Sequence, residues 1–113
     1  MADPFADVRA HCLGIDGVTE RLSHGAPTFF TRRGKSFVTC HDDHHGDGKL
    51  ALWMAAPPGA QEAAVAEDPE VYYRPAYVGS RGWLGVRLDR GLDLAVIKEL
   101  LDTAHTAVSP QAS

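Results

Sequence analysis

The first half of the chain is a succession of short β-rich segments separated by tight turns, which restricts the possible folds more than any other feature. Arg33-Gly34 lies between two of these segments at the spacing of an antiparallel hairpin. A polar, glycine-containing loop over 42–48 separates the next two. Strands joined so closely pair in antiparallel fashion. Three or four strands are predicted in this half, from the extended segments over 18–25, 28–32, 35–41 and 49–55.

Three further segments predict helices, one at each end of the chain and one in between. The first helix starts at Asp3 and Pro4, which suit a helix N-terminus, and stops at Gly14. The last begins after Asp93 and carries apolar residues at helical spacing as far as Val108. The remaining predicted elements are a helix over 60–67 and two short strands over 71–73 and 83–88.

These elements predict an α+β fold of two layers, in which an antiparallel sheet of about five strands has helices on one face. The 113 residues contain no internal repeat, so we expect one domain over 1–113, ordered from about 4 to 109 and frayed after Ser109. No stretch approaches the roughly 20 apolar residues of a membrane-spanning helix. Nothing at the start is typical of a signal peptide, and Cys12 and Cys40 are not close-spaced, so a reducing cytoplasm is the expected location.

The densest group of possible metal ligands runs from His41 to Asp47 and holds three histidines and three aspartates. A structural zinc site needs a second ligand pair elsewhere, and a calcium loop needs a glutamate where Met54 stands. Cys40 and His41 are neighbours in a predicted strand and point to opposite faces, so they cannot act as nucleophile and base. Phosphate-loop and dinucleotide motifs are absent. We therefore expect a solvated loop, no metal, no cofactor and no enzymatic activity.

Two basic clusters remain as candidate binding residues. The chain is acidic overall, with 11 Lys and Arg against 15 Asp and Glu and a net charge of −4, so a nucleic acid would require a local basic patch. Arginine binds phosphate and stacks on aromatic rings; in the alternative interpretation, these arginines are solvated and the nearby aromatic residues form the core. The clusters are Arg32, Arg33 and Lys35 around one turn, and Arg74 and Arg81 on either side of Tyr77.

Four short motifs precede the closing helix over 92–108: HGAPTF at 24–29, RGKSF at 33–37, LALW at 50–53 and RGWLGV at 81–86. In this order and spacing they resemble the MmcQ/YjbR family of small bacterial proteins. The resemblance covers nearly the whole chain, from about Phe5 to Pro110.

The resemblance implies an α+β domain in the order α-β-β-β-α-β-β-α, similar to type III secretion chaperones and the frataxin-like CyaY proteins. It also implies binding to double-stranded DNA, because family members are commonly described as DNA-binding by analogy to a double-winged arrangement of hairpins. The wings would be the turn at 33–35 and the connection over 74–81. The acidic loop over 42–47 should then face away from DNA, since carboxylates and phosphates repel each other.

Our first hypothesis is a non-enzymatic, cytoplasmic DNA-binding domain that contacts phosphates through the two basic clusters, with Tyr77 as a stacking side chain. It requires that the two clusters converge on one surface. The second hypothesis is a small-molecule-binding protein whose aromatic pocket contains Trp53, Tyr73 and Trp83. A third is a chaperone-like module that binds a protein through an exposed apolar patch.

Overall fold

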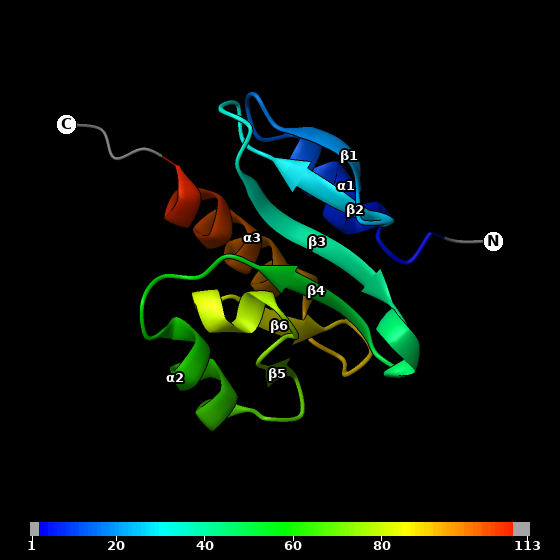
Figure 1. Cartoon of the computed structure of the whole chain (residues 1–113), viewed down its shortest axis with the longest axis vertical. Helices are drawn as coiled ribbons and strands as arrows, with labels where there is room; N and C mark the ends of the chain where they lie inside the picture. Colours follow the sequence, from blue (N-terminus) through cyan, green and yellow to red (C-terminus); the bar gives the residue numbers. More distant parts are fainter. Residues whose placement is uncertain (1–2, 110–113) are drawn as a thin grey trace.

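The computed structural model describes residues 3–109, which form an antiparallel sheet with flanking helices (Figure 1). The predicted α+β fold is confirmed, with six strands in place of about five. The predicted frayed tail after Ser109 lies outside the described residues. The elements are α1 Ala6–Leu13, β1 Thr19–Ser23, β2 Ala26–Phe30, β3 Ser36–Asp42, η1 His44–Gly46, β4 Leu50–Met54, α2 Ala60–Glu67, β5 Tyr72–Tyr73, η2 Val78–Arg81, β6 Leu84–Arg87 and α3 Leu94–Val108, where η denotes a 3-10 turn.

The sheet has the strand order β1-β2-β3-β4-β6-β5, and every neighbouring pair is antiparallel. The first four strands form a meander. The chain then passes through α2 to the edge strand β5 and, after η2, returns as β6 between β5 and β4. Thr39 pairs with Trp53 and Trp53 with Gly85, so these three residues share one face of the sheet.

The opposite face carries the hydrophobic core, because α1 and α3 both pack against it (Figure 1). Phe37, Val38 and Cys40 of β3 are buried in this core. Burial raises the pKa of Cys12 and of Cys40 to about 12, so both free thiols stay protonated at neutral pH. Helix α2 instead packs beside the edge strand β5. No helix within residues 3–109 has the length and apolar character needed to cross a membrane.

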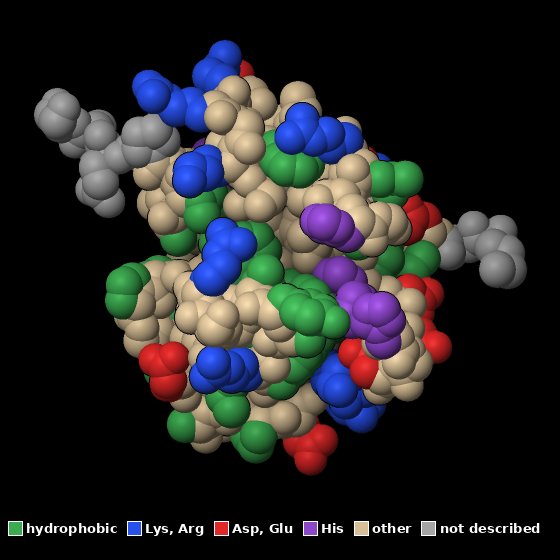
Figure 2. Space-filling model, in the orientation of Figure 1, with side chains coloured by type: hydrophobic (Ala, Val, Ile, Leu, Met, Phe, Trp, Pro, Cys, Tyr) green, Lys and Arg blue, Asp and Glu red, His purple; other side chains and the backbone are tan. Residues whose placement is uncertain are grey.

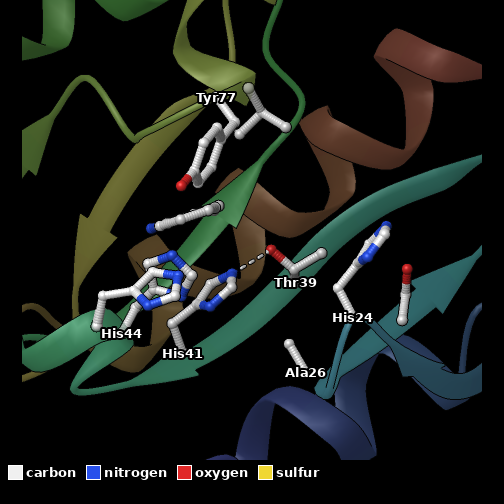
Figure 3. Close-up of a pocket in the computed structure, with 10 residues that line it drawn as sticks. His24, Ala26, Thr39, His41, His44 and Tyr77 are labelled. Atoms are coloured by element: carbon white, nitrogen blue, oxygen red, sulfur yellow. Dashed lines mark hydrogen bonds between the residues drawn. The ribbon is translucent and has the colours of Figure 1, made fainter.

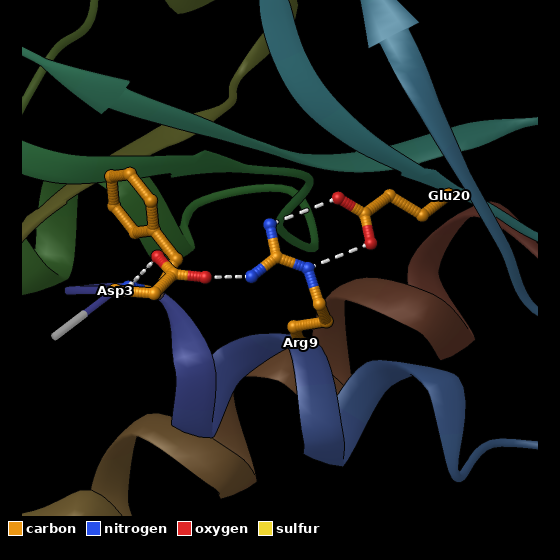
Figure 4. Close-up of polar contacts among 4 residues, drawn as sticks. Asp3, Arg9 and Glu20 are labelled. Atoms are coloured by element: carbon orange, nitrogen blue, oxygen red, sulfur yellow. Dashed lines mark hydrogen bonds and ion pairs between the residues drawn. The ribbon is translucent and has the colours of Figure 1, made fainter. Parts of the chain in front are cut away.

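The two predicted helix-start aspartates behave differently. Asp93 occupies the N-cap position of α3, but its side chain makes no capping hydrogen bond. Asp3 accepts a hydrogen bond from the backbone N–H of Phe5 and pairs with Arg9 of α1 (Figure 4). Arg9 also donates to both carboxylate oxygens of Glu20 on β1, at 2.8 and 3.0 Å. This network connects α1 to β1, and the two carboxylates pair with the positive charge of Arg9.

Candidate functional site

The structure brings the two distant basic clusters together in part. Arg33 and Lys35, from the turn between β2 and β3, and Arg81, from η2, line one hollow of about 560 Å³ beside the last turn of α3. We call this site the basic hollow. Its three cations have no carboxylate within ion-pair distance among the described residues. The positive charge of the basic hollow is therefore not neutralised by ion pairs within the described residues.

The β2–β3 turn has the backbone conformation that projects its cations outward. Gly34 has a φ of +85°, a left-handed conformation that suits glycine best. Thr31 and Lys35 are joined by a 2.8 Å backbone hydrogen bond, and the Thr31 hydroxyl accepts a second hydrogen bond from the N–H of Lys35. The turn is thus a defined structure that presents Arg33 and Lys35 to solvent.

A buried glutamine holds η2 in place. Gln61 of α2 donates from its side-chain nitrogen to the carbonyl oxygens of Gly79, at 2.8 Å, and of Trp83, at 2.5 Å. The guanidinium of Arg81 lies 5.2 Å from the centroid of the Trp83 ring, within cation–π distance. The position of Arg81 therefore depends on a helix that lies outside the basic hollow.

Two other predicted phosphate ligands do not line the basic hollow. The guanidinium of Arg32 lies 2.6 Å from the carboxylate of Asp16, with which it forms a solvent-exposed ion pair. Arg32 therefore lies apart from Arg33 and Lys35, and its predicted contact with phosphate stays a prediction. The side chain of Arg74 lies across Gly79, where an added Cβ would come within 2.6 Å of it, and remains exposed.

Positive charge is concentrated on the face of the sheet that α1 and α3 leave open. Figure 2 shows Lys and Arg side chains down the middle of this face, whereas the visible Asp and Glu side chains lie at its margins. Histidines gather beside an apolar area on the same face. Within residues 3–109, the four exposed large apolar residues, by contrast, lie on four separate segments: Leu13, Leu22, Tyr77 and Leu94.

The histidines belong to a second hollow, of about 370 Å³, which we call the aromatic pocket (Figure 3). Thr39, His41 and Trp53, from β3 and β4, form its floor. The end of the β1–β2 hairpin, including His24, bounds one side, and Tyr77 bounds the other. None of the residues that line the aromatic pocket is Asp, Glu, Lys or Arg.

The rings in the aromatic pocket are closely packed. His41 lies 3.8 Å from Trp53, centroid to centroid, at an interplanar angle of 31°, and His44 meets the same indole edge-on at 4.7 Å. The Trp53 N–H donates to the hydroxyl of Tyr73, at 2.8 Å. Burial, followed by the proximity of His44, lowers the pKa of His41 to about 4. At neutral pH this ring is therefore uncharged, and it shares a 2.7 Å hydrogen bond with the Thr39 hydroxyl.

The aromatic residues predicted to line a pocket separate into different environments. Trp53 lines the aromatic pocket, and Tyr73 accepts a hydrogen bond from its indole N–H. Trp83 is buried, and the guanidinium of Arg81 lies over its ring. The histidines and Thr39 were not predicted to line a pocket. The signal was present in β3, because Thr39 and His41 alternate with core residues and must share the open face.

The structure does not group the His41–Asp47 segment into a metal centre. Across residues 3–109, no three His, Cys, Asp or Glu side chains are placed to hold a metal ion together. Asp43 and Asp47 accept hydrogen bonds from the backbone N–H groups of Gly48 and Lys49 within the loop, and His41 and His44 pack on Trp53. Turn formation and ring packing account for these side chains.

The low pKa of His41 predicts that stability depends on pH. Unfolded His41 takes up a proton near pH 6.5, and folded His41 only near pH 4, so the unfolded state binds more protons in this window. The free energy of unfolding should therefore fall as pH decreases from about 6.5 to about 4. Each pKa unit corresponds to about 1.4 kcal/mol, and after solvent screening of this partly exposed ring we expect a loss of about 1 to 2 kcal/mol.

Urea denaturation at several pH values measures this loss, and a His41→Gln variant is the matched control. The variant cannot titrate at this position, so its free energy of unfolding should change less over the same pH window. Parallel pH profiles for the two proteins would contradict the assignment to His41.

Comparisons with known proteins agree with this architecture. A family model described as YjbR matches residues 13–107. No curated protein matches the chain significantly. The fold is similar to a crystal structure of the Deinococcus radiodurans protein DR2400, described as a DUF419 domain, with a TM-score of 0.78 and 16% sequence identity. That similarity covers 96% of this chain and 82% of the other. At this identity the similarity concerns the fold alone.

Proposed function

Because this chain belongs to the YjbR family, as its motifs predicted, and presents a basic hollow beside the last turn of α3, we propose that it is a non-enzymatic DNA-binding domain. The observation that carries the proposal is the convergence of Arg33, Lys35 and Arg81 with no carboxylate of residues 3–109 within ion-pair distance. Phosphate oxygens are natural partners for such a group, since guanidinium and ammonium groups donate charge-assisted hydrogen bonds to them.

The local charge balance favours an anion despite the acidic composition of the chain. The C-terminal end of α3 borders the basic hollow and carries roughly half a negative charge from its backbone dipoles. Three full positive charges outweigh it by a factor of about six. The basic hollow therefore keeps a net positive potential.

The acidic loop lies too far from the basic hollow to cancel this potential. Ser36, at the start of β3, lines the basic hollow, and Asp42, at the end of the same strand, begins the loop. Six residues of extended strand span roughly 20 Å. This distance is about two and a half times the Debye length at physiological salt, so the repulsion from the loop is largely screened.

The proposal predicts a defined salt dependence of binding. With about three phosphates neutralised, the logarithm of affinity for duplex DNA should fall against the logarithm of salt concentration with a slope of about −2.7. Fluorescence anisotropy of a labelled oligonucleotide between about 50 and 200 mM salt measures this slope. A slope near zero, or no binding of either duplex or single-stranded DNA at the lowest salt concentration, would contradict phosphate recognition.

A further inference from the structure

The aromatic pocket and the basic hollow adjoin each other on two elements. On β3, Ser36 lines the basic hollow and Thr39 the aromatic pocket; on η2, Arg81 lines the basic hollow and Val78 the aromatic pocket. Three residues of extended strand correspond to roughly 10 Å. A DNA strand whose phosphates lie in the basic hollow therefore has a nucleotide within reach of the aromatic pocket.

The lining of the aromatic pocket suits an uncharged planar ring. It contains no Asp, Glu, Lys or Arg, and His41 is uncharged at neutral pH because its pKa is lowered to about 4. Stacked rings and a few polar groups, such as the Thr39 hydroxyl, surround a volume of about 370 Å³, which lies in the range of small-ligand pockets. A base fits this chemistry, whereas a phosphate group does not. His44 and His45 belong to the acidic loop over 42–47, so a base bound here lies beside that loop, contrary to the expectation that the loop faces away from DNA.

Tyr77 provides the strongest indication that the aromatic pocket has an occupant. Its backbone has a φ of 62° and a ψ of −68°, and Val78 donates to the carbonyl of Ala76 across it at 2.6 Å, which is a classic γ-turn. This turn is rare and strained for a residue with a side chain. The side chain is 77% exposed, so its burial in the free protein does not repay the strain.

Stacking of a base on the Tyr77 ring would offset the backbone strain at this residue. Backbone strain of this kind and stacking on one base are of similar size, because each changes an equilibrium constant by about one to two powers of ten. His24 and His45 also have positive φ values, so three of the four non-glycine residues with positive φ in the described chain line the aromatic pocket. Strained backbone conformations of this kind concentrate at functional sites.

We propose that the aromatic pocket holds one unstacked base of a single DNA strand, stacked against Tyr77, while the adjoining basic hollow holds phosphates of the same strand. This inference rests on the proposed function of the basic hollow. A base in a duplex is paired and stacked, and must be extruded before it can enter. The protein should therefore bind single-stranded DNA at least about tenfold more tightly than a duplex of equal length.

The test compares Tyr77→Gly, Tyr77→Phe and Leu22→Ala with the unmodified protein. The probes are a labelled oligodeoxythymidine of about twelve nucleotides and a duplex of the same length. Tyr77→Gly should lower single-strand affinity by about tenfold with an unchanged salt slope, whereas Tyr77→Phe, which keeps the ring, should stay within about threefold. Leu22 is another exposed apolar residue, at 71% exposure and outside both sites, so Leu22→Ala should bind normally.

Stability separates this role from a structural one. Glycine relieves the strain at position 77, so Tyr77→Gly should unfold at the same or a higher urea concentration than the unmodified protein. Full single-strand affinity in Tyr77→Gly, a marked loss of its stability, or equal affinity for duplex and single strand would overturn the base-binding inference. Phosphate binding in the basic hollow is compatible with each of these results. If the protein bound neither the single strand nor the duplex, the proposed function itself would be overturned.

Discussion

Reversing the charges of Arg33 and Arg81 together is expected to weaken DNA binding by about 100-fold at about 0.1 M salt. Each residue comes from a different one of the two segments that form the basic hollow. A hydrogen bond to a charged group contributes about 1.5 kcal/mol or more, so loss of two such contacts corresponds to about 3 kcal/mol. The salt slope should also become shallower by about two, one for each lost phosphate contact.

The matched control for Arg33→Glu with Arg81→Glu is Arg90→Glu with Lys98→Glu. Both double variants lower the formal net charge of −4 by the same amount, because each reverses two cations. Arg90 and Lys98 are exposed and line neither the basic hollow nor the aromatic pocket. If both variants lost affinity equally, net charge alone would govern binding and the basic hollow would have no specific role.

Replacing Gln61 with leucine is expected to lower the free energy of unfolding by about 2 to 3 kcal/mol. The side chain is buried, and leucine of similar size cannot donate to the carbonyl oxygens of Gly79 and Trp83. The Gly79 oxygen keeps the N–H of Gly82 as a donor, so we assign most of the loss to Trp83. A buried carbonyl that loses its donor costs about 1 to 3 kcal/mol, and the weakened attachment of η2 adds to this.

The same variant should also lower the affinity for DNA, because η2 carries Arg81 and adjoins Tyr77. Urea denaturation and the anisotropy titration measure the two effects in one preparation. Glu62→Leu, on the exposed neighbouring position of α2, is the control and should change stability by less than about 0.5 kcal/mol. Equal stability of Gln61→Leu and the unmodified protein would show that η2 does not depend on these two hydrogen bonds.

Much of the fold was predictable because its signals are local. The helix over 60–67 has the predicted bounds, and Ile97, Leu101 and Ala104 form the buried stripe that helical periodicity indicated in the last helix. The hairpin at Arg33-Gly34 was also found, because its turn chemistry is contained in a few consecutive residues. β1 and β5, at the two edges of the sheet, lie within the predicted strands over 18–25 and 71–73, and the sheet contains six strands in place of about five.

The candidate site was less predictable, because its members meet only through long-range contacts. Nothing near Arg32 in the sequence identifies Asp16 as its partner, and this pairing separates Arg32 from its neighbour Arg33. The segment from His41 to Asp47 holds the densest group of possible metal ligands in the sequence. In the structure, the rings of His41 and His44 pack on Trp53, from the next strand. The strain at Tyr77 is also invisible in the sequence, since no residue pattern predicts a classic γ-turn there.

The order of residues by itself determined the strands, the helices, the tight hairpin and the supply of cations, because periodicity, turn chemistry and charge act over a few positions. Only the tertiary structure decided which cations remain unpaired and which rings share a pocket. The reason is physical: ion pairing and ring packing depend on distances of a few ångströms between side chains that are far apart in the chain. Such distances exist only once β6 has inserted beside β4 and η2 has docked on Gln61.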